Sequence, residues 1–340
     1  ENANFKQCLE ALKERFEATF IPIQLPIGSQ ADFEGVIDLI VLKAYRGTKA
    51  EEGEVPAYLE DEANEYRLQL IEVAAESEDE LIVKYLEGEE LTEDEIRRGL
   101  KARIADGSVV PVLCGSATAS NGVQALLQAI IWYLPSPADT EGIVATNPAT
   151  GEDETLQPNE LSPLAVLAFK TLADPYVGKL TYFRVYAGLM EADSRVFNSR
   201  SGEEERIGQL YFLRGKSQIP TDRIRAGDIG AVAKLANTST GDTLCDKGHP
   251  LVLTPPVFPK PVFSVAVHPK TKADLDKMST TLARLVEEDP TLHVDREPST
   301  NETILSGMGE SHVDIAARRL QQKFGVNITT SVPKVPYRET

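Results

Sequence analysis

The candidate for ligand binding in this sequence is a polar loop, Gly115-Ser-Ala117, between a short apolar run and an apolar helical segment. Backbone N–H groups at a strand–loop–helix junction can donate to a ligand oxygen. A three-residue match is weak by itself, and an ordinary connecting loop is the alternative. The sequence has no GxxxxGK[ST] phosphate loop, GxGxxG, HExxH, GxSxG or EF-hand motif, so the common motifs with a defined mechanism are missing.

A second candidate is a run of basic residues interleaved with aromatic ones. Residues 195–225 hold seven basic and four acidic residues, with Phe197, Tyr211 and Phe212 between them. Basic residues beside aromatic ones are typical of RNA contact, although a solvated face of β structure gives the same pattern. The basic residues are Arg195, Arg200, Arg206, Arg214, Lys216, Arg223 and Arg225.

Histidine and cysteine give no metal or catalytic site. The four histidines are dispersed without a partner at i+3 or i+4, and the three cysteines form no CxxC pair. We therefore nominate no metal ligand and no catalytic residue. The cysteine count predicts a reducing, cytoplasmic setting, and no apolar run is long enough to span a membrane. The start, which lacks methionine and a basic leader, predicts a soluble piece of a longer protein.

The net charge of −18 is concentrated in one segment. Residues 51–95 contain 18 acidic groups against Arg67 and Lys84, which gives −16 there and −2 for the rest of the chain. The total therefore does not argue against an RNA partner. The acidic segment is either a solvated pair of helices or a docking surface for a basic partner.

The 340 residues predict several domains of different class. Residues 1–137 alternate helices and strands as in an α/β domain, with capping boxes expected at Ser77–Glu80 and Thr92–Glu95 and an apolar helical face from Val123 to Leu134. Residues 138–162 are interpreted as an exposed linker, and 163–258 as an antiparallel β-barrel or sandwich. Residues 259–335 show the β-α-β-β-α-β order of a ferredoxin-like domain.

The segments described above follow one another in an order that resembles bacterial elongation factor G, the translocation GTPase. The matching runs are in family order along essentially the whole chain. They are Phe33-Glu-Gly-Val-Ile-Asp-Leu39, Pro111-Val-Leu-Cys-Gly-Ser-Ala117, Tyr133-Leu-Pro-Ser-Pro137, Asp174-Pro-Tyr-Val-Gly-Lys-Leu180, Gly241-Asp-Thr-Leu244, Glu287-Glu-Asp-Pro290, Ser306-Gly-Met-Gly-Glu310 and Tyr337-Arg-Glu-Thr340.

The resemblance implies the following domain roles. Residues 1–137 are similar to the last part of the GTPase domain, with an acidic helical insert at about 40–106, and 336–340 to the start of a fourth domain. The second domain is similar to a β-barrel that meets ribosomal RNA, which favours contact through Arg195, Arg200, Arg214, Lys216, Arg223 and Arg225. Glu310, Ser311 and His312 are implied to face another domain or ribosomal RNA, and the insert at 51–95 to face ribosomal stalk proteins.

Ser116 and Ala117 match the family's fifth GTPase motif, in which the alanine N–H recognises the guanine keto oxygen and the serine shapes the turn. GTP or GDP with Mg²⁺ is implied for the whole protein. None is expected to bind these residues alone, because the phosphate loop and NKxD are missing. The fragment is therefore expected to be inactive by itself, and neither a membrane nor DNA is expected as a partner.

The implied function is GTP hydrolysis that drives ribosomal translocation or, for a divergent paralogue, ribosome recycling. The usual GMGELH reads Gly307-Met-Gly-Glu-Ser-His312 here, and the insert is shorter than in common members; both differences fit a paralogue. Two alternatives remain: a ribosome-protection factor of the same architecture, and a non-catalytic ribosome-binding module.

Overall fold

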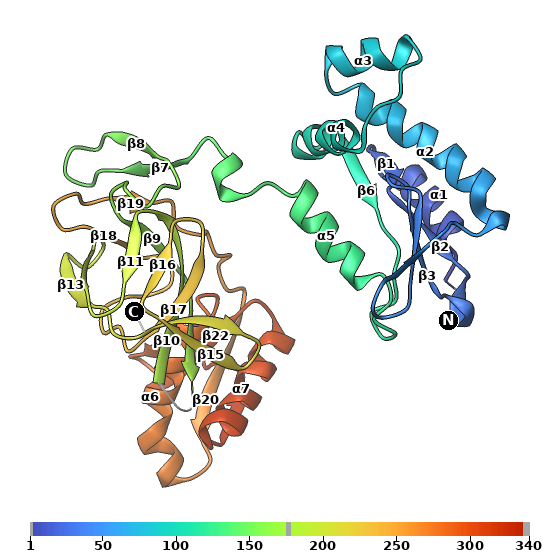
Figure 1. The fold of residues 1–340 in the computed structure, drawn as a ribbon. Helices are drawn as coiled ribbons and strands as arrows, with labels where there is room; N and C mark the ends of the chain where they lie inside the picture. Colours follow the sequence, from blue (N-terminus) through green and yellow to red (C-terminus); the bar gives the residue numbers. More distant parts are fainter. Residues whose placement is uncertain (1–2, 175–177, 336–340) are drawn as a thin grey trace. The chain divides into compact units, whose positions relative to one another are not determined.

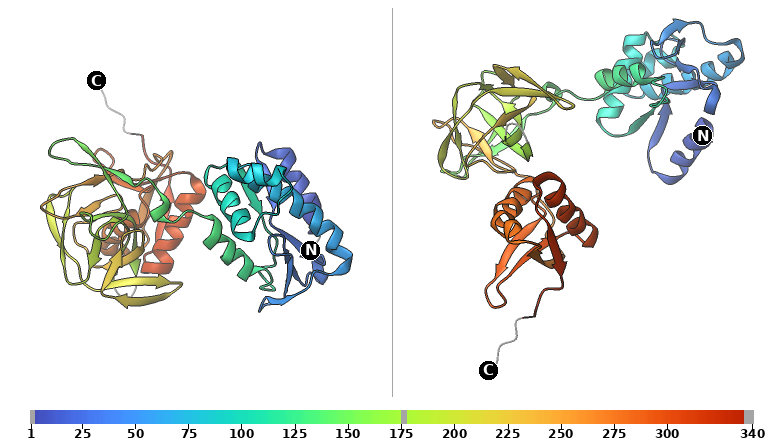
Figure 2. Two further views of the ribbon diagram at one scale, coloured as in Figure 1. Left: turned by 45° about the horizontal axis from the view of Figure 1, so that its top comes forward. Right: turned by 90° about the horizontal axis from the view of Figure 1, so that it is seen from below.

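The structure is a computed structural model that describes residues 3–174 and 178–335. The expected start of a fourth domain at 336–340 lies outside the described residues. The chain divides into two compact units, Glu1–Pro135 and Ser136–Thr340. Each unit is described by itself (Figures 1 and 2).

Unit 1 contains two small sheets and five α-helices among its described residues. A parallel pair joins β1 to β6, and an antiparallel meander has the order β2-β3-β4-β5. The elements are α1 (Phe5–Arg15), β1 (Thr19–Pro22), β2 (Gln24–Ile27), η1 (Gln30–Asp32), β3 (Gly35–Asp38), β4 (Lys43–Arg46), β5 (Glu51–Gly53), η2 (Ala57–Leu59), α2 (Glu60–Ala75), α3 (Asp79–Leu86), α4 (Glu93–Ala105), β6 (Val109–Val112) and α5 (Val123–Tyr133).

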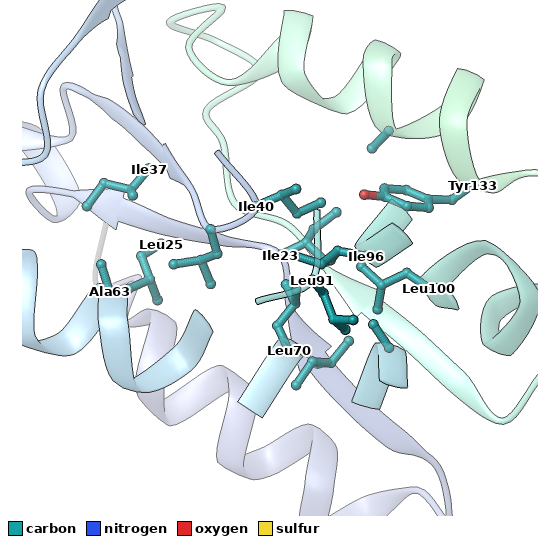
Figure 3. Packing of buried hydrophobic residues seen from close by; sticks show 14 of the residues in the cluster. Ile23, Leu25, Ile37, Ile40, Ala63, Leu70, Leu91, Ile96, Leu100 and Tyr133 are labelled. Atoms are coloured by element: carbon teal, nitrogen blue, oxygen red, sulfur yellow. The ribbon is translucent and has the colours of Figure 1, made fainter. Parts of the chain in front are cut away.

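The core of unit 1 lies where the two sheets meet α2, α4 and α5. Figure 3 shows Ile23 and Ile40 from the strand side close to Ile96 and Leu100 of α4. The guanidinium of Arg67 in α2 donates to the backbone oxygens of Leu39 and Ile40, which fixes α2 against the β3–β4 turn. The acidic segment therefore folds onto the core through its apolar residues while its carboxylates remain outside.

The acidic segment differs from the expected pair of helices, because three helices follow β5. The capping box at Thr92 is confirmed, since its side chain receives the Glu95 N–H and the Glu95 carboxylate receives the Thr92 N–H. The box expected at Ser77 is wrong: α3 begins at Asp79 with Glu78 as its N-cap. Ser77 instead completes the end of α2, because its N–H donates to the Ala74 oxygen.

Unit 2 begins with a β domain. Its main sheet has eight antiparallel strands in the order β13-β12-β18-β9-β10-β17-β14-β15, beside smaller sheets β11-β16 and β19-β7-β8. The elements are η3 (Pro137–Asp139), β7 (Ile143–Thr146), β8 (Asp153–Leu156), β9 (Ala165–Asp174), β10 (Gly178–Ala187), β11 (Leu189–Glu191), β12 (Arg195–Asn198), β13 (Glu203–Arg206), β14 (Leu210–Arg214), β15 (Ser217–Thr221), β16 (Arg223–Arg225), β17 (Ile229–Ala233), β18 (Thr243–Cys245) and β19 (Val252–Leu253).

The segment 138–162 is not the exposed linker that its composition suggested. It forms the hairpin β7–β8, and β19 adds to β7 in antiparallel register. Ala145 and Leu156 are buried against Leu251 and Leu253. This hairpin is held by residues about a hundred positions later, a non-local contact that local composition does not encode.

The α+β domain has the predicted order and topology. Its four strands lie in the order β21-β22-β20-β23, all antiparallel, with two helices (Figure 2). Its core joins Leu282 and Leu285 of α6 to Val313 and Leu320 of α7 and Leu305 of β22. The elements are β20 (Phe263–Pro269), α6 (Lys272–Glu288), β21 (His293–Glu297), β22 (Glu302–Gly307), α7 (Glu310–Phe324) and β23 (Ile328–Ser331).

Candidate functional site

The polar loop at Ser116 is closed by its own backbone. The Ser116 N–H donates to the Asn121 oxygen at 2.9 Å, and the Asn121 N–H donates back to the Ser116 oxygen at 3.1 Å. These two bonds close residues 117–120 into a compact turn between β6 and α5. The turn therefore presents its outer backbone groups in a fixed arrangement.

Asn121 and Gly122 make this closure possible. The Asn121 side chain is 9% exposed, and its Nδ2 donates to the Phe33 oxygen at 3.3 Å, which ties the turn to the segment before β3. Gly122 has φ 77°, and a Cβ there would lie 2.8 Å from the Cys114 oxygen, so glycine is required. The sequence predicted no role for Asn121, although Asn-Gly is a recognised turn signal.

Ala117 lies at the exposed side of this turn. Its N–H has no hydrogen-bond acceptor within the described part of the chain. Ser116 Oγ receives the Ala119 N–H at 3.3 Å and lies 3.4 Å from Thr118 Oγ1, so this serine shapes the turn through its side chain. The geometry thus leaves the Ala117 N–H, held on a closed turn, available to an acceptor on a ligand.

The helix that follows the turn is α5. The sequence predicts its apolar face as part of an α/β unit, and in the structure this face is exposed to solvent. Leu127 is 56% exposed and Ile131 is 72% exposed, and Val123, Leu126, Ile130 and Leu134 are also exposed. Helix α5 contacts unit 1 through its opposite side, where Ala129 and Tyr133 are buried. We call these six aliphatic residues the α5 stripe.

The basic residues of the β domain fall into three environments. Three arginines form ion pairs at the surface: Arg195 with Glu204 at 3.4 Å, Arg206 with Asp193 at 4.0 Å, and Arg225 with Glu160 at 3.1 Å. Arg200 binds the buried carboxylate of Asp242. Arg214, Lys216 and Arg223 are exposed and have no ion pair within the described residues.

The three unpaired cations do not form one patch. Arg214 pairs in register with Ser217 at the tip of the β14–β15 hairpin, next to Lys216. The opposite end of the hairpin is the Leu210–Thr221 pair, and Arg223 lies beyond it. Four residues of strand separate the ends by about 13 Å, at about 3.3 Å per residue. Arg214 and Lys216 therefore form a separate, two-cation tip.

Asp242 organises the loop between β17 and β18. It is 3% exposed and receives the Asn198 Nδ2–H at 3.0 Å, the Ser239 N–H at 2.8 Å and the Arg200 guanidinium. Burial opposes ionisation, but the hydrogen bonds from Arg200, Asn198 and Ser239 hold the pKa of Asp242 below its usual value. Arg200 therefore has a structural partner, which the sequence run alone did not reveal.

His312 is fixed within the α+β domain. Its Nδ1 receives the Met308 N–H at 3.1 Å, so Nε2 carries the ring proton and donates to Asp289 Oδ2 at 3.0 Å. Glu310 and Ser311 lie exposed at the start of α7. The polar serine therefore occupies a solvated position. The roles implied for these three residues stay predictions, as do those of Ser116, Ala117 and the basic residues.

Two properties of the described residues concern ligands and membranes. Residues 3–174 and 178–335 contain no group of three or more His, Cys, Asp or Glu side chains arranged to hold a metal ion. In the same residues, no helix combines the length and apolarity that crossing a bilayer requires.

Comparison with known proteins identifies two of the domains. Residues 163–247 match the family model of elongation factor G domain 2, and residues 258–332 match that of elongation factor G domain III. A crystal structure of a Thermus thermophilus protein is similar to the chain with a TM-score of 0.82 and 30% sequence identity. That match covers 99% of this chain and 48% of the Thermus chain, so the chain spans about half the length of the structure that it matches. The chain is therefore a multidomain protein that contains a β domain of the elongation factor G domain 2 type and an α+β domain of the domain III type.

Proposed function

We propose that this chain is part of a translational GTPase of the elongation factor G type, which uses GTP hydrolysis to drive ribosomal translocation or recycling in the cytoplasm. In this proposal, unit 1 is the C-terminal part of the GTPase domain, and Ala117 contributes to guanine recognition. The observation that carries the proposal is the free Ala117 N–H on a closed turn, in a chain that continues into elongation factor G domains 2 and III.

The chemistry of the turn supports guanine over adenine. Guanine presents its O6 as an acceptor, whereas adenine presents an amino group at the same ring position. A fixed N–H donor that meets O6 gains a hydrogen bond, and one that meets an amino group is left without an acceptor. The Ser116–Asn121 bonds hold the donor in place before a ligand arrives.

Two features of unit 1 support a larger α/β domain. Parallel sheets occur almost only in domains where several strands are covered on both faces. Among the described strands, β1 and β6 form a parallel sheet of two strands, and no third strand pairs with either of them. The α5 stripe is a continuous apolar surface of a kind that monomeric proteins rarely leave in water. Both are explained if further strands of a GTPase domain extend the sheet and cover α5.

GTP with Mg²⁺ is the proposed cofactor of that complete domain. The residues that hold phosphates and Mg²⁺ in such domains belong to motifs that residues 1–340 do not contain, and the described residues form no metal-ligand group. Hydrolysis is therefore not assigned to any residue of this chain. The contribution assigned here is base recognition through the N–H of Ala117.

A nucleotide-selectivity experiment tests base recognition. In the product of the complete open reading frame, Ala117→Pro removes the N–H, and Ala117→Gly keeps it as the matched control. The proline variant should lose most of the preference for GDP over ADP, about tenfold or more for one hydrogen bond to a desolvated acceptor. Equal selectivity in both variants would contradict the role of Ala117.

A ribosome-binding experiment tests the partner. Co-sedimentation of the chain with ribosomes should weaken when Arg214→Glu and Lys216→Glu are combined, and the dependence of log K on log salt should become shallower by about 1 per lost phosphate contact. Lys13→Glu with Arg15→Glu on α1 changes the charge equally and is the control. No binding by the unmodified chain at low salt would contradict the proposal, and unchanged binding by the hairpin-tip variant would show that these cations are only solvated.

A further inference from the structure

The end of helix α6 carries three consecutive carboxylates, Glu287, Glu288 and Asp289. The last turn of α6 contains no basic residue. The carboxyl end of a helix is the negative end of its dipole, so anions there are locally unfavourable, and adjacent anions repel each other. Partners from other elements must therefore stabilise this arrangement.

Glu287 and Glu288 find partners on two strands of the β domain. Glu287 Oε1 lies 3.2 Å from Lys179 Nζ on β10. Glu288 Oε1 receives the backbone N–H of Ala173 on β9 and also pairs with Lys323 on α7. The Glu288 side chain is only 8% exposed, so both of its bonds are screened weakly by solvent.

Asp289 turns the opposite way, toward the start of α7. Its Oδ2 accepts a hydrogen bond from His312 Nε2–H, with 3.0 Å between Nε2 and Oδ2. Its Oδ1 accepts a hydrogen bond from the Thr291 N–H at 3.0 Å. His312 in turn receives the Met308 N–H, which fixes the turn at Gly307–Gly309. Successive residues of one helix end thus bind the β domain and the turn that precedes α7.

The contact between the two domains is not tightly packed. A cavity of about 490 Å³ lies beside the carboxylates, lined by Thr171 and Lys179 of the β domain and by Arg284 and Lys323 of the α+β domain. Beside this cavity, the Lys179–Glu287 ion pair and the Ala173–Glu288 hydrogen bond join the strands to α6. Removing one of those bonds leaves room for the two surfaces to separate.

We propose that Glu287, Glu288 and Asp289 form a clamp that holds the α+β domain on the β domain and connects the Gly307–Gly309 turn to that joint. Glu288 is the central positioning residue of the three, because its carboxylate binds Ala173 of β9 and Lys323 of α7 at the same time. Loss of its carboxylate releases the joint while both domains remain folded, since neither hydrophobic core includes it.

Carbodiimide cross-linking of the full chain tests the clamp. The reagent joins a carboxylate and an amine that are in contact, forming an amide, and takes up the water lost as a urea. Mass spectrometry should find a Lys179–Glu287 link in the unmodified chain. The Lys84–Glu95 pair of unit 1, at 2.8 Å, is the internal reference.

The expected result depends on Glu288. In Glu288→Ala the Lys179–Glu287 link should fall by about tenfold, as for the loss of a hydrogen bond to a charged acceptor, while the reference link is unchanged. Asp295→Ala removes an exposed carboxylate of β21 in the same domain and should leave both links unchanged. A missing Lys179–Glu287 link in the unmodified chain, or an unchanged link in Glu288→Ala, would overturn the proposal.

Amide hydrogen exchange separates release from unfolding. In Glu288→Ala, exchange at Ala173 should accelerate by about tenfold, whereas Leu305, which pairs with Val265 in the β20–β22 ladder, should keep its protection. If Leu305 exchanges as fast as Ala173, the domain has unfolded and Glu288 is a folding residue, which overturns the clamp. Glu288→Gln keeps an acceptor for Ala173 and should give an intermediate rate.

Discussion

The α5 stripe makes a sharp prediction about two neighbouring positions on one helix. Ile131 belongs to the stripe and is 72% exposed, whereas Ala129, two residues earlier, is 7% exposed on the packed side. Glutamate at position 131 should therefore be tolerated by this chain, and glutamate at position 129 should not. The sequence pattern alone predicts the reverse, because Ile131 lies in the apolar face and Ala129 does not.

The magnitudes follow from the exposed fractions. Complete burial of an isoleucine side chain stabilises by about 1.5–3 kcal/mol, so losing the remaining quarter costs about 0.4–0.8 kcal/mol. Glutamate regains a few tenths of a kcal/mol in helix propensity, which leaves less than about 1 kcal/mol. Ala129→Glu overfills a packed site and buries a carboxylate, which costs at least about 3 kcal/mol.

Tryptophan fluorescence during urea unfolding measures both changes. Trp132 is the single tryptophan of the chain, and the Arg97 guanidinium lies 4.4 Å from its ring centroid, so its emission reports unit 1 alone. Ala129→Glu should lower the urea midpoint by at least about 1 M, for a slope of about 1–3 kcal/mol/M, and Ile131→Glu by much less. A loss of about 2 kcal/mol or more in Ile131→Glu would refute the exposed position of the stripe.

Three further predictions concern titratable groups. Asp242→Ala should destabilise the β domain by about 2–3 kcal/mol, less than for a fully buried ion pair because Arg200 is 58% exposed. Because the folded pKa of Asp242 is lowered, its contribution is present above the usual aspartate pKa and lost as pH falls through the folded value, which an acid titration followed by circular dichroism measures. Burial raises the pKa of the Cys114 thiol to about 12, so a thiol reagent at about pH 8 should label exposed Cys8 well before Cys114, as peptide mass spectrometry would show. Burial raises the pKa of Asp38, so its contribution is present at low pH and lost as pH rises through the folded value. Asp38→Asn should leave stability unchanged or raised at about pH 7 by Trp132 fluorescence, and a loss of about 2 kcal/mol would contradict this.

Local patterns predicted the elements whose stability is local. The capping box at Thr92 needs only Glu95 three residues later, and the alternation of strands and helices after residue 259 is complete within one domain. The Ser77 box has the same pattern, with serine in place of threonine, but the chain is still completing α2 there. The packing of α2 against α4 decides the outcome: a Cβ at Gly99 would lie 2.9 Å from Ser77 Oγ. A motif therefore predicts which bonds are available and not which of them tertiary contacts permit.

The candidate sites show the same limit. The prediction for Ser116 and Ala117 rests on a short local motif and the family resemblance, whereas Asn121 acts through Phe33, 88 residues earlier, which no local motif encodes. The sequence predicts one basic surface at 195–225. The strand register instead separates Arg214 from Arg223, and Arg200 forms an ion pair with Asp242, which lies farther along the chain. Charges close in sequence are not close in space when a hairpin intervenes.

Exposure in the folded chain also changes what an apolar pattern means. The α5 stripe has the periodicity of a core helix, yet its six residues are solvent-exposed in this structure. The β1–β6 pair is a second feature of this kind, since a two-stranded parallel sheet lacks the neighbours that such sheets normally have. The stability cost of Ile131→Glu, measured in this chain and in the complete protein, distinguishes whether Ile131 is a surface residue or a core residue that is uncovered here. It should cost less than about 1 kcal/mol in this chain; if the proposed function is right, it should cost about 2 kcal/mol or more in the complete GTPase domain, where the proposal buries the same side chain.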